Sequence, residues 1–319
     1  MKQRLLRTIA STRNYLSKLI HAKAQSLPPE QTAKLPLRAD DITSEATKKR
    51  LLAAELPIPA SFTALLGERT TKKVLSPNKL PEWHLNNKLV AHHFAAAAGC
   101  RAPKNYQQRI SCQEITIKPG SVIKPYQGAS SSGVFFVHGK NNIVEKQTGS
   151  VLNQTQLRRA LQAYEDDRWI VEELIAGPNG QHPRDLKFYC FYGQVVLVLE
   201  KSPDNTYCFW DASGQVYDTG KYQPEDCFDG QVFTNKQLEQ AAQLCQEIPT
   251  PFIRIDFLDP GGQKDLVFGE FTPRPGGYAR VNRQTDTLLG NAFLDAERRL
   301  FDDLLAGKDF TVYKKSISG

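Results

Sequence analysis

Pairs of short apolar segments joined by turn residues and separated by helix-like stretches constrain the fold of this chain most strongly. FFVHGKNNIVEKQ turns at Gly139–Asn142, DLKFYCFYGQVVLVLEK turns at Gly193, and PFIRIDFL and DLVFGEFT flank the turn sequence DPGG. Runs of β-branched and aromatic residues around such turns predict antiparallel hairpins. Residues 153–166 and 235–246 predict helices. Hairpins alternating with helices predict α+β lobes and argue against a doubly wound parallel sheet.

The charge of the chain is distributed unevenly. Residues 1–50 carry eleven Lys and Arg against four acids, a difference of seven that equals the net charge of all 319 residues. The remaining body is close to neutral and lacks interleaved aromatic and basic residues, so we predict no nucleic-acid partner. A basic arm on a neutral body suits an anionic surface, a phospholipid headgroup or an acidic polymer, and equally a solvated helix or a partner-docking arm. Residues 2–20 carry a loose apolar helical stripe that fits a membrane interface or packing on the body.

The cysteines and the N-terminus indicate the compartment. Six cysteines without CxxC pairs predict free thiols in a reducing compartment. No secretory apolar segment and no run of about 20 apolar residues occurs, so we predict a cytoplasmic protein, with peripheral contact at the inner face of the membrane left open by the basic arm. His92 and His93 are adjacent in the helix-like segment 86–104, point to different faces, and are expected on an ordinary helix surface.

The third hairpin carries acidic and polar side chains in alternation. Because side chains alternate along a strand, Arg254 and Asp256 share one face, and Glu270 and Thr272 share a face of the returning strand. Two acids with a nearby hydroxyl suit hard Mg²⁺, with nucleotide phosphates and water completing its octahedron. A solvent-facing strand pair with routine charges fits the same pattern.

Two loops of small residues suit anions. IKPYQGASSSGVFFV places Lys124 at a strand end before the small residues 128–133, whose backbone N–H groups can approach phosphate closely. It is not a P-loop, because the lysine of GxxxxGK[ST] would fall on Val134; a flexible surface hairpin is the alternative. PRPGGYAR, after the third hairpin, brings Arg274 and Arg280 to a diglycine turn.

Two predicted strands carry residues that could bind the adenine and ribose of a nucleotide. WIVEELIAG could line an adenine slot with the Glu172 side chain and the backbone of residues 173–175. Asp185 and Lys187 alternate on one face of DLKFYCF, where they suit ribose hydroxyls and phosphate. Solvated acids at a strand end and a surface lysine explain the same residues.

Together these segments resemble the ATP-grasp superfamily. NNKLVAHHFAAAAGCRAPK resembles its lysine-bearing helix, and DLKFYCFYGQ and FGEFTPRPGG resemble most closely the teichuronopeptide-biosynthesis (TupA-like) branch. The resemblance runs from about Pro81 to Leu305. It implies an α+β ATP-grasp fold in which two lobes grip Mg-ATP. The implied divisions are a basic helical segment (1–75), a small α/β pre-ATP-grasp region (76–118), a small lobe (119–176) and a large lobe with the metal site (177–319).

The resemblance also assigns roles to residues. It implies magnesium at Asp256, Glu270 and Thr272, although Thr272 stands where many members have Asn. It implies ATP contacts from Lys88, Lys124, Ser130, Ser131, Ser132, Glu172, Glu173, Ile175, Asp185 and Lys187. Arg254 would stabilise the reacting oxyanion together with Lys124, and Arg274 and Arg280 would hold an anionic substrate. Asn87 stands where many members have Asp before the lysine.

The implied activity is ATP-dependent carboxylate–amine ligation through an acyl phosphate. The branch points to an amino acid or peptide joined to a uronic acid of a cell-envelope or capsular polysaccharide. A kinase that phosphorylates a sugar hydroxyl could use the same nucleotide site, and a non-catalytic protein that binds anionic glycans could use the basic arm. Fold alone does not decide among them.

Overall fold

The computed structural model describes residues 60–76, 80–126, 132–164, 168–180, 182–261 and 265–318. The apolar helical stripe predicted at residues 2–20 lies outside these residues, as do Ser130 and Ser131. Phe62–Gly319 forms one compact unit. No helix in the described part of the chain combines the length and the apolarity needed to cross a bilayer.

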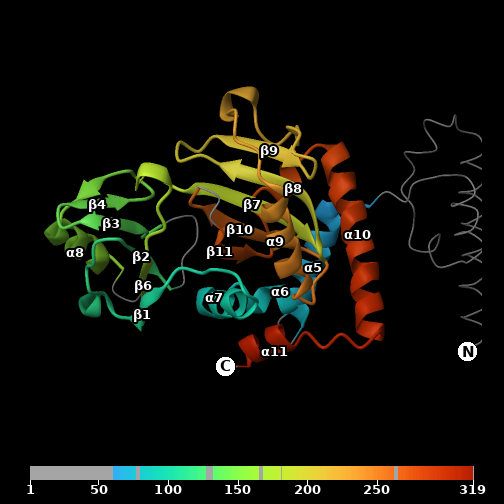
Figure 1. Cartoon of the computed structure of the whole chain (residues 1–319), viewed down its shortest axis with the longest axis horizontal. Helices are drawn as coiled ribbons and strands as arrows, with labels where there is room; N and C mark the ends of the chain where they lie inside the picture. Colours follow the sequence, from blue (N-terminus) through green and yellow to red (C-terminus); the bar gives the residue numbers. More distant parts are fainter. Residues whose placement is uncertain are drawn as a thin grey trace, which may run out of the picture. The chain divides into compact units, whose positions relative to one another are not determined.

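The first sheet is antiparallel, with strand order β1-β6-β2-β3-β4-β5 (Figure 1). Its strands are β1 (Asn105–Ile110), β2 (Ser121–Pro125), β3 (Phe135–Gly139), β4 (Asn142–Glu145), β5 (Val151–Leu152) and β6 (Trp169–Glu173). Helix α8 (Gln154–Gln162) buries Leu157 and Leu161 in a core that also contains Ile123 and Val171. Because side chains alternate along a strand, the next residues on β2 and β6 project from the opposite face of the sheet.

One expectation for the first sheet is wrong. The sequence EITIKPG (residues 114–120) reads as a short β-rich run closed by Pro and Gly, but residues 112–114 form a 3₁₀ turn and residues 115–120 contain no strand. The Ser111 and Glu114 side chains close a capping box around this turn, a local arrangement that competes with extended backbone. Strand β1 was missed because its sequence, NYQQRI, is polar, as befits an edge strand with no fully buried side chain.

The second sheet has the order β11-β10-β7-β8-β9 and is also antiparallel. Its strands are β7 (Arg184–Phe191), β8 (Gln194–Lys201), β9 (Tyr207–Asp211), β10 (Ile253–Asp259) and β11 (Val267–Thr272). The predicted hairpins are confirmed as β3–β4, β7–β8 and β10–β11. The helix predicted at residues 235–246 is confirmed as α9 (Asn235–Gln246).

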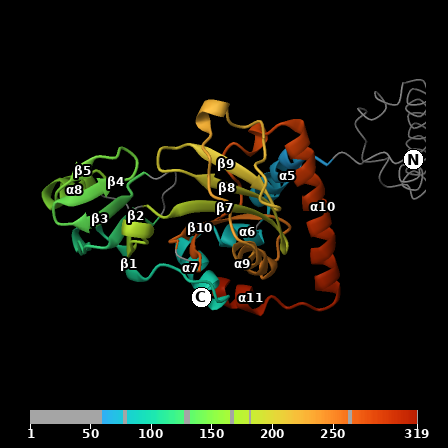
Figure 2. The ribbon, with the colours of Figure 1, turned by 45° about the horizontal axis from the view of Figure 1, so that its top comes forward.

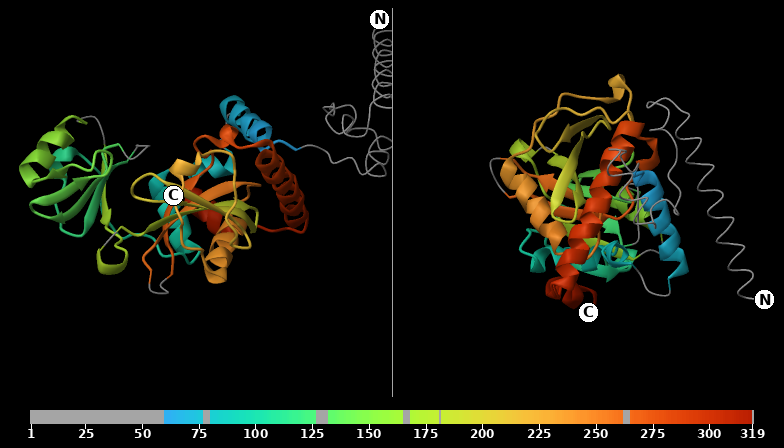
Figure 3. Two further views of the ribbon diagram at one scale, coloured as in Figure 1. Left: turned by 90° about the horizontal axis from the view of Figure 1, so that it is seen from above. Right: turned by 90° about the vertical axis from the view of Figure 1, so that its right-hand side faces the viewer.

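Helices pack around the second sheet (Figure 2). Helix α9 contacts β7, β8 and β10, and α7 (Lys88–Ala97) contacts β11. Helix α10 (Arg283–Leu305) lies beside α5 (Phe62–Leu75), as Figure 3 shows, while α6 (Pro81–His84) and α11 (Thr311–Ile317) are short. Phe62 of α5 is fully buried against Phe191 and Phe252 of the large core. The predicted division at residue 75 stays a prediction.

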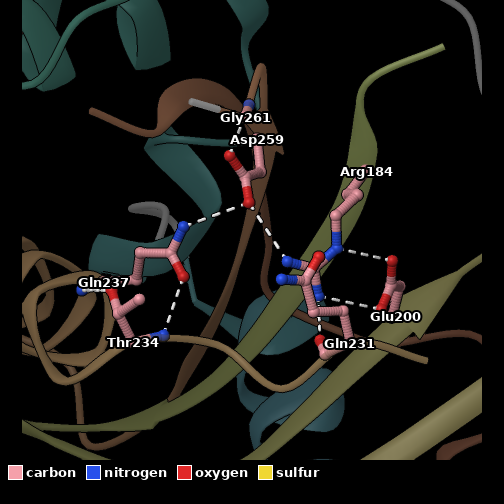
Figure 4. Close-up of polar contacts among 7 residues, drawn as sticks. All are labelled: Arg184, Glu200, Gln231, Thr234, Gln237, Asp259 and Gly261. Atoms are coloured by element: carbon pink, nitrogen blue, oxygen red, sulfur yellow. Dashed lines mark hydrogen bonds and ion pairs between the residues drawn. The ribbon is translucent and has the colours of Figure 1, made fainter. Parts of the chain in front are cut away.

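An ion network behind β7 fixes this strand against its neighbours (Figure 4). The Arg184 guanidinium donates to both carboxylate oxygens of Glu200, at 2.8 and 3.0 Å, to Asp259 Oδ2 at 3.2 Å, and to the carbonyl of Gln231. Asp259 also accepts from Gln237 Nε2 at 3.1 Å, which ties in α9. Since Arg184 and the next residue project to opposite faces, this network holds the strand whose other face carries Asp185 and Lys187.

Candidate functional site

Three strands of the second sheet bring their predicted site residues into one row. Asp256 on β10 lies directly opposite Glu270 on β11 and Lys187 on β7, and Arg254 lies opposite Thr272. Directly opposed residues of antiparallel strands project to the same face at neighbouring positions. The structure therefore brings together the residues predicted from the alternation in the third hairpin.

Two cations hold the Asp256 carboxylate. Arg254 donates through Nε and Nη2 to both carboxylate oxygens at 2.6 Å, and Lys187 Nζ donates to Oδ2 at 2.9 Å. Arg254 Nη2 also donates to Thr272 Oγ1 at 3.0 Å, and Lys187 Nζ to Asp185 Oδ1 at 2.6 Å. Burial alone would raise the pKa of Asp256, but the two cations lower it below its ordinary value. Asp256 is therefore ionised at neutral pH.

The Glu270 carboxylate differs from that of Asp256. It makes no hydrogen bond or ion pair with any other residue in the described ranges, and its side chain is exposed. Burial by surrounding atoms and the Asp256 carboxylate both raise the pKa of Glu270, and the charges of Lys187 and Arg254 partly oppose this rise. Two like charges on opposed strands repel, so the pair suits a bound cation. With the Thr272 hydroxyl, the two carboxylates fit Mg²⁺ held jointly with nucleotide phosphates.

Gly269 lets strands β10 and β11 approach each other closely. A Cβ there would lie 2.9 Å from the Asp256 carbonyl oxygen, closer than real Cβ atoms come to other atoms. The β10–β11 ladder shifts register between Asp256 and Phe257, opposite this glycine. The irregularity therefore lies next to both acids, where bulges commonly re-aim a side chain.

Lys221 adds a cation that no sequence pattern indicated. Its Nζ donates to the Gly276 carbonyl at 2.8 Å, in the PRPGGYAR turn. Burial, together with the charges of Arg254 and Arg280, lowers the pKa of Lys221 to about 8. A single lysine in the loop after β9 gives no periodic or spacing signal, so only the fold shows its place.

The two predicted arginines lie in the PRPGGYAR turn as well. Both Arg274 and Arg280 are exposed, and the Arg274 guanidinium lies 5.1 Å from the centre of the Tyr278 ring. Neither has an ion pair within the part of the chain that the structure covers. This turn therefore presents positive charge without a neutralising acid.

The first sheet contributes Lys124 and Glu172 from neighbouring strands. Lys124 Nζ lies 2.5 Å from Glu172 Oε1, and both side chains are largely buried. Lys88 Nζ donates to the Pro125 carbonyl at 2.8 Å, which places α7 over the end of β2. Asn87, where many ATP-grasp proteins have Asp, caps α7 by accepting from Leu89 N, at 3.0 Å.

The other predicted nucleotide residues have varied surroundings. The Glu173 side chain pairs with Arg101 at 3.1 Å and accepts from Lys104 N at 3.2 Å, so its backbone is the part that remains for adenine. Ile175 is buried. Ser132 is partly buried just before β3, and Asp185 holds Lys187.

The surface position expected for both histidines was wrong for His92. His92 is 5 % exposed, whereas His93 is exposed. The His92 ring meets Phe268 edge to face at 5.6 Å, and Phe268 lies on β11 two residues before Glu270. Adjacent helix positions point about 100° apart, so one histidine can be buried while the other remains exposed.

Charges on the two sheets act on each other. Lys124 of the first sheet lowers the pKa of Glu270 on the second, and Lys124 and Glu172 both shift the pKa of His92 on α7. Lys124 of the first sheet and the paired acids of the second are therefore close enough to interact electrostatically. An Arg-x-Asp strand beside a Glu-x-Thr strand, with a lysine and a glutamate on a second antiparallel sheet, matches the ATP-grasp arrangement that the sequence resemblance implies.

The chain belongs to the TupA-like ATP-grasp family, whose model matches residues 68–294. This confirms the predicted family, the α+β ATP-grasp fold and the assignment to ATP-dependent ligases by class. No curated protein matches the chain.

Three solved structures illustrate the similarity of the chain to proteins of known structure. The D-alanine–D-alanine ligase from Bacillus anthracis is 14% identical, covers 74% of this chain and 76% of its own, and has a TM-score of 0.46. The ATP-grasp ligase PsnB, complexed with a phosphomimetic variant of its minimal precursor, Mg and ADP, is 12% identical over 82% and 74%, with a TM-score of 0.41. The macrocyclase MdnC bound with precursor peptide MdnA, from Microcystis aeruginosa, is 14% identical over 82% and 73%, with a TM-score of 0.39.

Proposed function

We propose that this protein uses Mg-ATP to join a carboxylate to an amine. The carboxylate belongs to a uronic acid of an anionic cell-envelope or capsular polysaccharide, and the amine to an amino acid or peptide. A carboxylate oxygen bonds to the γ-phosphorus of ATP as the bond to the bridging oxygen breaks, giving an acyl phosphate and ADP. The amine nitrogen then bonds to the acyl carbon and loses a proton as inorganic phosphate leaves.

The observation that carries this proposal is the environment of Lys221. The charges that act on its ammonium group are those of Arg254 and Arg280, and both are positive. A half-buried lysine among cations is stabilised by an anion, because an opposite charge offsets both burial and repulsion. The exposed Arg274 and Arg280 widen the same positive region. An anionic acceptor beside Asp256 and Glu270 fits this arrangement.

The chain's own residues divide the remaining work. Asp256, Glu270 and Thr272 would hold magnesium, which when bound with ATP neutralises phosphate charge and orients the γ-phosphoryl group. Lys124 and Lys187 would bind phosphate oxygens, and Arg254 would stabilise the oxyanion that develops at the acyl carbon. Glu172 and the backbone of residues 173–175 would bind adenine, with Asp185 on the ribose. Catalysis then consists of positioning and charge stabilisation, without a protein nucleophile.

The test is ADP and phosphate release with Mg-ATP, measured against a panel of amino acids, short peptides and uronic-acid oligosaccharides, with mass spectrometry of the products. A product lighter by one water than the two substrates combined supports ligation and names both partners. ADP with a phosphorylated sugar and no need for an amine would establish the kinase instead. Nucleotide binding without turnover on any anionic glycan would contradict the proposed acceptor class.

The charge of the N-terminal arm bears on where in the cell the enzyme works. We propose that the enzyme works in the cytoplasm and that its basic arm meets either an acidic polymer or the inner face of the membrane. The arm lies outside the described residues, so its charge is the support: eleven Lys and Arg against four acids in residues 1–50. We propose no nucleic-acid partner.

A further inference from the structure

Among the described residues, several buried polar side-chain atoms have no hydrogen-bond partner. Two of them, Glu172 Oε2 and Asn105 Oδ1, are on neighbouring strands of the first sheet, and both ring nitrogens of His92 on α7 belong to the same set. The Gly269 backbone raises the pKa of His92 but does not meet the geometry of a hydrogen bond to its ring. Buried polar atoms without partners are rare in folded proteins because each forfeits the hydrogen bond that water would give it. Three residues that share this property at one site indicate that a bound group supplies the missing partners.

The register of the sheet places Asn105 beside Glu172. Asn105 on β1 lies directly opposite Glu172 on β6, so both side chains project from the same face, which is also the face of Lys124. Lys124 occupies only Glu172 Oε1, at 2.5 Å. The second carboxylate oxygen and the neighbouring amide oxygen are therefore two acceptors without a donor.

Helix α7 brings His92 to the same face. His92 lies one helical turn after Lys88, so the two side chains share a face of the helix, and Lys88 reaches the Pro125 carbonyl of β2. Glu172 and Lys124 both act electrostatically on the imidazole. Burial lowers the pKa of His92, and Lys124 lowers it further, so the ring is neutral at physiological pH and offers one donor and one acceptor.

The three residues together present more acceptors than donors. An exocyclic amino group carries two N–H donors and satisfies such a set. Adenine has this group at ring position 6, whereas guanine and hypoxanthine carry a carbonyl acceptor there. A base carbonyl in this place would meet the Glu172 carboxylate and the Asn105 amide oxygen. All three oxygens are acceptors, so they would stay without hydrogen bonds and repel one another.

We propose that Asn105 and His92 act with Glu172 as the acceptor set for the exocyclic amino group of adenine, and so select ATP over ITP and GTP. The inference rests on the proposed nucleotide site at Glu172. It adds two residues, from β1 and α7, that no motif of the sequence marks. Their role is base selectivity, which is separate from the phosphate and metal contacts on the second sheet.

The experiment is calorimetric titration of the full chain with ATP, ITP and GTP in the presence of Mg²⁺. Wild-type protein is expected to bind ATP at least about tenfold more tightly than ITP, because one or more buried hydrogen bonds are lost. N105A and H92F are expected to reduce the ATP-to-ITP ratio by about tenfold, mainly through weaker ATP binding. H92Q keeps one donor and one acceptor and should largely restore the ratio.

H93F is the matched control, since it changes the adjacent, exposed histidine of the same helix. It should bind ATP and ITP as the wild type does. Circular dichroism on each variant identifies any that does not fold, and N105A and H92Q carry the test if H92F fails. Equal weakening of ATP and ITP by N105A and H92F would overturn the inference and assign both residues a structural role. Absence of any nucleotide binding by the wild type would instead overturn the proposed function along with it.

Discussion

Two carboxylates that face each other across a strand pair have opposite surroundings in this site. Asp256 is buried and held by Arg254 and Lys187, while Glu270 is exposed and has no ion pair in the described ranges. Their pKa values shift in opposite directions for this reason, down for Asp256 and up for Glu270. Asp256 organises the cations of the row, and the open Glu270 carboxylate is the one that we propose binds a metal.

Replacing Glu270 by Gln should abolish ATP turnover and leave the fold intact. The change removes a ligand charge at nearly constant volume, and it also removes the repulsion with Asp256. A carboxyl group whose pKa is raised in the folded state destabilises that state above its pKa, so at pH 7 the unfolding free energy of E270Q should equal or exceed that of the wild type. Urea unfolding and ADP release measure the two effects.

The control for E270Q is D265N, which removes a carboxylate of an exposed ion pair with Lys236 near the same hairpin. It should turn over ATP normally and leave the free energy of unfolding nearly unchanged, because solvent screens an exposed ion pair. Near-normal turnover in E270Q would sink the metal assignment.

The lowered pKa of Lys221 predicts a pH dependence of substrate binding. In the proposed function the protonated amine binds the anionic acceptor, and its pKa of about 8 means that the charge is lost as pH rises through 8. kcat/KM for the acceptor should therefore fall above pH 8, since this ratio reports groups of the free enzyme. K221R should move the fall to higher pH, because arginine stays charged.

Removal of the Lys221 amine tests the same assignment. K221M should raise KM by about tenfold to a hundredfold at pH 7, the range for a lost hydrogen bond to a charged group, and should abolish the limb above pH 8. K236M, which changes an exposed lysine, serves as the control. An unchanged pH profile in K221M would show that another group titrates.

At the scale of elements, the sequence predicted the arrangement of candidate site residues where a single hairpin carried both the side-chain alternation and the acidic residues. Alternation alone predicted that Asp256 and Glu270 share a face with their partners, and the β10–β11 register confirms it. Lys221 and Asn105 escaped prediction because their roles come from neighbours that are distant in the chain. Lys221 meets Arg254 and Arg280 only through folding, and Asn105 meets Glu172 only through pairing of β1 with β6.

The pairing of β7, β8 and β10 depends on the Arg184 network. R184M should lower the free energy of unfolding by about 3–5 kcal/mol, because it leaves the buried carboxylates of Glu200 and Asp259 without their cation. R298M, which removes an exposed helical ion pair with Asp302, should change it by no more than about 0.5 kcal/mol. Urea unfolding compares the two, and a similar small loss in both would show that the network does not stabilise the strands.

For the whole molecule, the decisive property is that the site draws on both sheets. Each sheet buries its own core, one around Val171 and Leu157 and the other around Phe188 and Ile255, so each is held together without the other's residues. The residues proposed to bind nucleotide, in contrast, are split: Lys124 and Glu172 lie on the first sheet, and the acids proposed to hold magnesium lie on the second. Bound Mg-ATP would therefore contact both sheets, and its binding energy would depend on both.

This division predicts how a non-hydrolysable ATP analogue stabilises the protein. At a ligand concentration of 100 Kd the folded state gains about 2.7 kcal/mol, which raises Tm by several degrees in a chain of this size. K124M should reduce that shift with or without Mg²⁺, because it removes a phosphate contact. E270Q should abolish only the additional shift that Mg²⁺ brings. In the double variant the two losses should combine to less than their sum, because both residues hold one ligand. A shift in E270Q that still grows with Mg²⁺ as in the wild type would place the metal on other residues and leave the nucleotide on the first sheet alone.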